Sequence, residues 1–520
     1  MPANILLGLD RERLSVWHSI SLLALASVVY GCGLVIYRLT LSPLARYPGP
    51  KLAAATGWYE VYYELFHKGG GQFPFHVEAL HAKYGSIVRI NPWELHVNDP
   101  AYYNLIYSTS LHHDKLQSMK YRATAPTGIF STPEHDLHRI RRAALAPYFS
   151  KRRVRAYVPY LGHILDQLCY RLKHEYAGKG KVLNLGDMWS SYTADVMTNY
   201  AFQKQYRFLE QPDFICPFTE NINQITELVP WMNVFTFLGY LATYTPPWLL
   251  KRVLPGSHGL LDFKSELISN IKRVKSEKFI PTADEGTHDN LFYELLRSNL
   301  PESEKSDERM EHEALGVIGA GIETTKHAAT ICCFHVLANP RIFETLQKEL
   351  VRVMPDPHGS IPELSQLEAL PYLTACIEEA IRLTYGNPGR SPRTSLTALQ
   401  FGNTTVPPGI PVSTSVVSIH HNTDLFPQPR EFIPERWLDP NTRTYLKGFQ
   451  VSFGKGTRIC VGMNMAYAEL YMALAVILRR VDMELFETSR KDVDLARCLF
   501  APRPVKESLG VRVKVRDVLA

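Results

Sequence analysis

Apolar residues recur at helical spacing through most of this chain. Hydrophobic side chains three and four positions apart are the pattern of an amphipathic helix with one buried face. The pattern predicts helices over residues 75–84, 135–149, 154–175, 260–278, 310–338, 341–353, 370–384 and 463–481. Residues 281–307, rich in charge and serine, precede the longest helix and are predicted to form an exposed connection.

Strand-like alternation of apolar and polar residues is confined to short segments. Residues 87–91 and 94–97 alternate on either side of Pro92-Trp93, which predicts a hairpin. A further alternating run, residues 509–515, lies near the C-terminus. The sequence therefore predicts a mainly α fold with small peripheral β-sheets.

The N-terminal region breaks the amphipathic pattern. Residues 14–37 contain no charged side chain, and their length suits one bilayer crossing, which needs ~20 residues, better than a signal peptide, whose apolar stretch has about 7–15. Arg38, Arg46 and Lys51 follow this stretch, whereas the charges before it nearly cancel, so the positive-inside bias places the main body in the cytosol. We predict a short lumenal N-terminus (1–13), a transmembrane anchor (14–37), a proline-rich hinge (38–50) and a main domain (51–520).

Residues 228–250 form a second charge-free stretch. They are rich in aromatic residues and include Pro246-Pro247, which suits a segment at the membrane surface or over a pocket better than a lipid-exposed span. A buried core segment is the alternative.

Composition narrows the function classes. Of the 520 residues, 45% are hydrophobic and 21% charged, as in a globular protein, and the net charge of +6 gives no reason to propose nucleic acid as a partner. The eight cysteines are scattered without C-x-x-C pairs, which argues against a zinc site or a disulfide scaffold.

One cysteine lies in a distinctive loop. Residues 453–462 read Phe-Gly-Lys-Gly-Thr-Arg-Ile-Cys-Val-Gly and lead into the helix predicted from Met463. Positive potential from the helix N-terminus and from Arg458 is expected to favour the Cys460 thiolate, a soft ligand suited to iron. A buried structural cysteine is the alternative.

The spacing Phe-x-x-Gly-x-Arg-x-Cys-x-Gly resembles the haem-binding signature of the cytochrome P450 monooxygenases. The resemblance implies that Cys460 is the axial ligand of the haem iron. It also implies that Phe453, Gly454 and Arg458 belong to the haem-binding loop, and that residues 51–520 form the haem-binding catalytic domain.

Residues 320–325, Ala-Gly-Ile-Glu-Thr-Thr, lie within the longest predicted helix. Gly321 weakens a helix, and the Thr324 hydroxyl can bond back to a carbonyl one turn earlier, which together predict a kink with a polar groove. Close packing on the glycine is the alternative. The stretch resembles the family's oxygen-activation motif, which implies that Thr324 helps to hold oxygen, that Glu323 relays protons and that Gly321 borders the haem.

Two further motifs precede the cysteine loop in the order of the P450 family. Glu379 and Arg382 are three residues apart on one helical face, and Pro434-Glu-Arg-Trp437 supplies Arg436. They resemble the family's Glu-x-x-Arg and Pro-Glu-Arg elements, which implies a structural lock near the haem.

Basic residues offer partners for the haem propionates. His138 and Arg142 lie four apart on one predicted helix and resemble the family's Trp-x-x-x-Arg element, with His138 in place of tryptophan. Arg393 and Arg458 are further candidates. A solvated basic face is the alternative for residues 138–142.

The resemblance implies haem b as cofactor and the insertion of one oxygen atom from O2 into a lipophilic small molecule. Electrons would come from NADPH through a separate flavoprotein reductase, with cytochrome b5 as a second candidate donor, at the endoplasmic reticulum membrane. The hinge Tyr47-Pro-Gly-Pro50 and residues 84–92 and 135–150 resemble fungal secondary-metabolism members near the trichodiene-oxygenase-like group, which implies a terpenoid or polyketide substrate. A haem-thiolate isomerase or dehydratase and a non-enzymatic haem sensor remain as alternatives.

Overall fold

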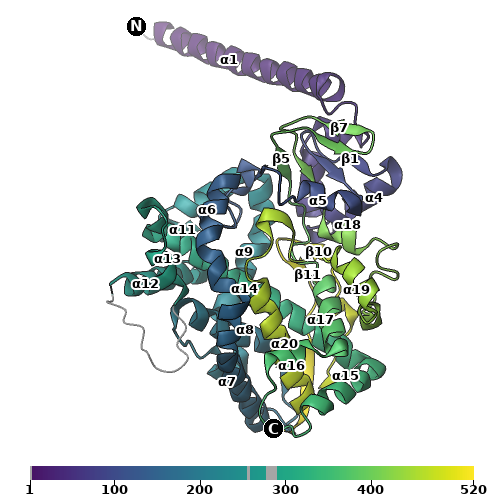
Figure 1. Cartoon of the computed structure of the whole chain (residues 1–520). Coiled ribbons are helices and arrows are strands. Elements are labelled where there is room, and N and C mark those ends of the chain that lie inside the picture. The colour runs from purple at the N-terminus through teal and green to yellow at the C-terminus, as the bar shows by residue number, and fades with distance from the viewer. Residues whose placement is uncertain (1–2, 254–257, 277–289, 520) are drawn as a thin grey trace.

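The structure is a computed structural model that describes residues 3–253, 258–276 and 290–519. A long N-terminal helix projects from a mainly helical body in which the small sheets lie at the periphery (Figure 1).

The α-helices follow one another along the chain in this order. They are α1 (Ala3–Ile36), α2 (Lys51–Ala55), α3 (Trp58–Val61), α4 (Phe73–Tyr84), α5 (Tyr103–Ile106), α6 (His135–Leu145), α7 (Lys151–Glu175), α8 (Leu185–Phe202), α9 (Pro217–Val234), α10 (Thr236–Tyr244), α11 (Pro247–Val253), α12 (His258–Ser276), α13 (Leu291–Arg297), α14 (Asp307–Ala338), α15 (Pro340–Val353), α16 (Leu364–Glu368), α17 (Pro371–Leu383), α18 (Val416–His420), α19 (Pro440–Lys447) and α20 (Met463–Arg480).

The strands are short and form four sheets. They are β1 (Ile87–Arg89), β2 (Leu95–Val97), β3 (His113–Lys115), β4 (Val182–Asn184), β5 (Arg393–Ser395), β6 (Leu399–Phe401), β7 (Thr404–Val406), β8 (Val412–Ser413), β9 (Val481–Leu485), β10 (Arg497–Cys498), β11 (Pro502–Arg503) and β12 (Arg512–Val518). The largest sheet has the order β1-β2-β8-β5-β3, and β12 lies between β4 and β9. The predicted hairpin is confirmed, because β1 and β2 pair antiparallel with Ile87 opposite Val97.

The eight predicted helices are all present, with ends within a few residues of the prediction. The stretch predicted over 135–149 ends as a 3-10 turn after α6. Helix α8 was not predicted. Its polar residues Ser190, Thr193 and Asp195 are buried together with its apolar ones, so polarity along this segment does not mark a solvent-facing side. Helix α14 contacts α8, α12, α17 and α20, which places it in the middle of the core (Figure 1).

One stretch of the described residues, Trp17–Leu41, is long and apolar enough to cross a bilayer, and none of its most apolar window is buried against the body. It comprises most of α1 and a π-helical turn, Tyr37–Leu41. The segment that follows is tied to the body, since Arg38 donates to the Ala55 carbonyl at 2.8 Å and Tyr47 donates to Thr405 O at 2.9 Å.

The aromatic stretch at residues 228–250 lies on the surface rather than in the core. It forms the end of α9, α10 and the start of α11, with exposed Trp231, Phe237, Tyr240 and Trp248. Trp231 also approaches Phe66 of the π-helical turn after α3, with ring centroids 6.0 Å apart. Two segments distant in sequence therefore build one exposed aromatic surface.

The structure describes only part of the connection predicted at residues 281–307. Residues 281–289 lie outside the described residues. Residues 290–307 are not simply an exposed link, because they include α13, whose Leu291, Phe292 and Leu295 are buried.

Candidate active site

The cysteine loop has a backbone that requires glycine. Gly456 has φ +73°, and a Cβ there would lie 2.4 Å from the Tyr107 carbonyl oxygen. Gly454 also has a positive φ, +68°, a region that residues with a Cβ rarely adopt. The Cys460 amide donates to Phe453 O at 2.9 Å and closes the loop immediately before α20.

Cys460 faces an internal space. It lies deep in the protein, yet its side chain is accessible to solvent, unlike the other cysteines of the main domain, which are buried. Burial raises the pKa of its thiol, against the lowering effect of the Gly462 amide and the Arg142 charge. Arg142 is the cation that acts on the Cys460 thiol, whereas Arg458 donates to Thr132 O and Pro133 O, both at 2.6 Å.

In the middle of α14, two residues on one side of the helix are accessible to solvent. Ala320 and Thr324, one turn apart, are accessible, whereas Ile322, Glu323 and Thr325 are buried. The Thr324 hydroxyl donates to Ala320 O at 2.8 Å, as predicted. Helix α14 continues without interruption from Asp307 to Ala338, and the kink at Gly321 stays a prediction.

Glu323 is held by two cations. Its carboxylate is 2.5 Å from Arg503 of β11 and 2.6 Å from Lys326 Nζ. Burial alone would raise the pKa of Glu323, but the charges of Lys326 and Arg503 outweigh it and lower the pKa to about 2. Glu323 is therefore a carboxylate at neutral pH.

Basic side chains gather beside the cysteine loop. Lys115, Arg393 and Arg458 are largely buried and influence one another, and none forms an ion pair with an acid in the part of the chain that the structure describes. Burial, then Arg393, lowers the pKa of Arg458 to about 9, and its buried Nε has no acceptor. His138 lies among these cations, and burial, then Arg458, lowers its pKa to about 2, so it is neutral. We call Lys115, His138, Arg393 and Arg458 the basic cluster.

Arg142 lies at the edge of this cluster, next to the cysteine loop. It donates to Ile459 O at 2.6 Å, one residue before Cys460. Its charge acts on both Cys460 and His138.

The three residues predicted to form a lock are in contact. Arg382 donates to both oxygens of Glu379, at 2.9 and 2.8 Å, and Arg436 Nε donates to the same carboxylate at 3.0 Å. The amide of Ile433 and the indole of Trp437 complete five donors to Glu379. Burial would raise the pKa of Glu379, but Arg382 and its other partners lower it.

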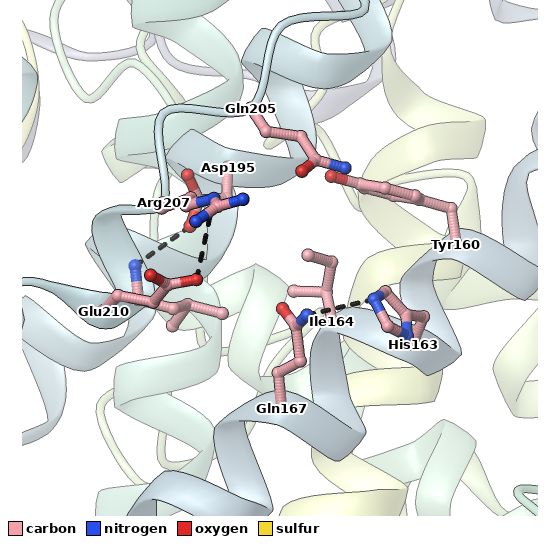
Figure 2. Close-up of a pocket in the computed structure, with 9 residues that line it drawn as sticks. Tyr160, His163, Ile164, Gln167, Asp195, Gln205, Arg207 and Glu210 are labelled. Carbon is pink, nitrogen blue, oxygen red and sulfur yellow. Dashed lines mark hydrogen bonds and ion pairs between the residues drawn. The ribbon is translucent and has the colours of Figure 1, made fainter.

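A separate pocket of about 150 Å³ lies between α7, α8 and residues 205–210 (Figure 2). Its buried acid, Asp195, accepts hydrogen bonds from the amides of Phe208 and Leu209, at 3.0 and 2.9 Å. Figure 2 shows Arg207 beside Glu210 at its rim. None of the predicted site residues lines this pocket.

The family model of Cytochrome P450 matches residues 55–509. The chain belongs to the cytochrome P450 family. It is 40% identical to cytochrome P450 monooxygenase orf4 of Eupenicillium brefeldianum, covering 96% of this chain and 98% of that protein. It is 37% identical to monooxygenase sdnE of Sordaria araneosa (96% and 98% covered) and to tryptophan 6-hydroxylase fscE of Fusarium equiseti (93% and 94% covered).

Haem iron is the cofactor of this family, and the residues of this P450 fit it. Cys460 offers a thiolate-forming side chain to an internal space, and the basic cluster supplies buried cations that lack acids and would pair with two propionates. When bound, haem supplies oxygen activation, while the protein supplies the ligand, the charges and the shape.

Gly321 packs closely against α8, and its place beside the haem stays a prediction. A Cβ at this position would lie 2.7 Å from Met197 Cγ of α8. The glycine therefore permits close packing of α14 on α8, which was the alternative stated for it.

Four residues beside the site were not predicted from the sequence. Lys115 and Arg122 lie in a stretch of mixed polar and apolar residues that has no clear pattern, and Lys326 and Arg503 hold Glu323. The Arg503 contact spans 180 residues and has no local signature.

Proposed function

We propose that this P450 is a membrane-anchored haem-thiolate monooxygenase that inserts one oxygen atom into a lipophilic small molecule. The balanced reaction is R–H + O2 + two electrons + two protons giving R–OH and water, and an alkene would give an epoxide. Cys460 is the proposed axial ligand.

One observation carries the proposal most strongly. Cys460 is exposed in a loop whose neighbouring residues, 452–459 and 461–464, are half-buried, and Thr324 is exposed on the largely buried middle of α14. Helices α14 and α20 are in contact. This supports one internal space between a soft ligand on one side and a hydroxyl on the other. The retained threonine favours a monooxygenase over an isomerase or dehydratase.

The remaining site residues have proposed roles that follow their contacts. The basic cluster and Arg142 bind the propionates, with neutral His138 as a hydrogen-bonding partner rather than a cation. Phe453 and Gly454 shape the loop beneath the haem. Glu323, as an ionised group, orients water that carries protons toward Thr324.

Electrons are proposed to come from NADPH through a separate flavoprotein reductase, with cytochrome b5 as a possible second donor. Lys447 and Lys455 lie close in sequence to Cys460 and offer charge complementarity to such a partner. We propose location in the endoplasmic reticulum membrane with the catalytic domain toward the cytosol, based on the Trp17–Leu41 stretch and the basic residues after it.

A role in fungal secondary metabolism is proposed from the relatives, which are fungal monooxygenases. The exposed aromatic surface around Trp231 and Phe66 suits a protein that takes an apolar substrate from the membrane. A terpenoid or polyketide is the proposed substrate class.

A spectrum tests the ligand assignment. The reduced carbonyl complex of the wild-type protein is expected to show the thiolate-type absorption, and Cys460→Ser should lose it. Cys32→Ser, which changes an exposed cysteine of the anchor, is the matched control and should retain it. Retention of the thiolate-type spectrum in Cys460→Ser would mean that another residue is the ligand.

The proposed reaction can be tested with the compound that accumulates when the gene is deleted. The compound that accumulates on deletion of the gene should be converted by the purified protein, a reductase, NADPH and isotopically labelled O2 into a product that contains one labelled oxygen atom. Conversion that needs neither O2 nor reductase would favour the isomerase alternative.

A further inference from the structure

Arg122 is a buried arginine without an acceptor. It is 4% exposed, its Nε is enclosed, and within residues 3–253, 258–276 and 290–519 it has no hydrogen-bond acceptor and no ion pair. Burial, then the Arg393 charge, lowers its pKa to about 10, which still leaves it cationic at neutral pH. A buried charge is costly unless an oppositely charged group meets it.

The backbone around Arg122 is fixed by its neighbours. The preceding residue, Tyr121, packs against Tyr240 and Tyr244, with ring centroids 5.5 and 6.1 Å apart. A Cβ on Gly239 of α10 would lie 2.6 Å from Tyr121 O, and Lys264 of α12 donates to Thr124 O at 3.2 Å. The turn is therefore held beneath the aromatic surface of α10, while Arg122 is buried.

The guanidinium of Arg122 lies 4.9 Å from the ring centroid of Phe130 and 5.7 Å from that of Phe500. Phe130 is 38% exposed, although Gly128 and Ser131 beside it are buried, so its ring faces an internal space.

That space is the proposed active site. The segment that carries Phe130 runs between α14 and the cysteine loop: Ile129 N donates to Glu313 of α14 at 3.1 Å, and Arg458 donates to Thr132 O. Phe500 lies between β10 and β11, and β11 provides Arg503, which pairs with Glu323 of α14. Arg122 is thus placed at the wall of the space above the cysteine loop.

Arg122 lies at the edge of the basic cluster, on the side of Phe130. Its charge acts on Lys115, and both Lys115 Nζ and the Arg122 guanidinium approach the Phe130 ring, at 4.5 and 4.9 Å from the ring centroid. The charges that act on His138 include Arg458, Lys115 and Arg142 but not Arg122. Likewise Arg393, but not Arg122, acts on Arg458. Lys115, Arg393 and Arg458 already exceed the charge of two propionates, so Arg122 is a surplus cation on the side of Phe500.

We propose that Arg122 binds a carboxylate of the substrate and so selects lipophilic acids. The inference rests on the proposed function, because it requires haem in the same space. An arginine presents a planar fork that matches a carboxylate, and the enclosed site strengthens the charged hydrogen bonds. The apolar part of the acid then lies along Phe130 and Phe500, with its far end toward the haem.

The test uses ligands whose position is reported by the iron. A graded series of ω-(imidazol-1-yl)alkanoic acids and their methyl esters is titrated into full-length wild-type holoenzyme, Arg122→Gln and Arg122→Lys, and binding is followed by the Soret shift on imidazole ligation. Haem per protein is measured in each variant, and Lys115→Gln serves as a control for the basic cluster.

At one chain length, the wild-type protein should bind the acid about tenfold more tightly than its ester, which corresponds to about 1.4 kcal/mol. Arg122→Gln should abolish that preference without changing ester affinity, Arg122→Lys should keep part of it, and Lys115→Gln should lower haem content while keeping the preference.

Equal affinities of acid and ester in the wild-type protein at every chain length would overturn the inference. So would a loss of haem in Arg122→Gln with the acid preference unchanged, which would assign Arg122 to a propionate. The ligand affinities and haem contents are measured without O2 or a reductase. A failure of the monooxygenase proposal would appear elsewhere, in the carbonyl spectrum or in turnover, so the two outcomes can be told apart.

Discussion

The pairing of Glu323 with Arg503 and Lys326 makes a quantitative prediction. The three side chains are 8%, 15% and 13% exposed, so their attraction is weakly screened. A pKa that falls from 4.5 to about 2 corresponds to about 3 kcal/mol of stabilisation, at 1.36 kcal/mol per unit. If the two cations share this effect, Arg503 accounts for about 1.5 kcal/mol.

A double-mutant cycle of Glu323→Gln and Arg503→Gln measures this coupling. Urea unfolding of the full-length holoenzyme in detergent, followed by loss of the thiolate-type carbonyl spectrum, should give a coupling of at least about 1.5 kcal/mol at neutral pH. The exposed pair Arg516 and Glu484, 59% and 46% exposed, is the matched control and should give about 0.5 kcal/mol or less.

The sign of the pH dependence is fixed by the direction of the shift. Because the pKa of Glu323 is depressed in the folded protein, the stabilisation is present above its ordinary value of 4.5 and is lost as the pH falls from there toward about 2. A Glu323–Arg503 coupling as small as that of the exposed control at neutral pH would refute the argument.

Three further predictions concern residues in contact with the site. Thr324→Ala should reduce the share of NADPH electrons that reach product by on the order of 10²-fold and release more peroxide, with substrate binding unchanged; unchanged coupling would reject its role. Glu379→Gln should destabilise the protein by about 3–5 kcal/mol, because two arginines lose their counter-ion, and a urea midpoint like that of wild type would contradict this. Gly321→Ala should cost about 1 kcal/mol through contact with Met197; if the same change costs as much in a Met197→Ala background, that contact is not the cause.

Local spacing was enough to predict much of the fold. The eight predicted helices have clear amphipathic periods, and the hairpin of β1 and β2 follows from alternation around Pro92-Trp93. Helix α8 could not be found in this way, because polar residues such as Ser190, Thr193 and Asp195 are buried on it beside the apolar ones. Periodicity of polarity reports a solvent-facing side only where the buried residues are apolar.

In the site, too, local contacts could be predicted from the sequence and contacts between distant segments could not. The cysteine loop and the Thr324 turn could be predicted because their residues interact within a few positions, as the Cys460 to Phe453 and Thr324 to Ala320 hydrogen bonds show. The packing at Gly321 could not be predicted, because Met197, which is distant in sequence, occupies the space beside the glycine.

The sequence by itself determined the family, the cysteine proposed as the iron ligand and the apolar N-terminal stretch, since each depends on a short run of residues. Only the tertiary structure decided the charge state of Glu323 and the burial of Arg122 without an acceptor among the described residues. Both depend on burial and on cations brought from other segments, Arg503 for Glu323 and Arg393 for Arg122. Electrostatic energy follows distance in space and exclusion of water, and neither can be read from position along a chain.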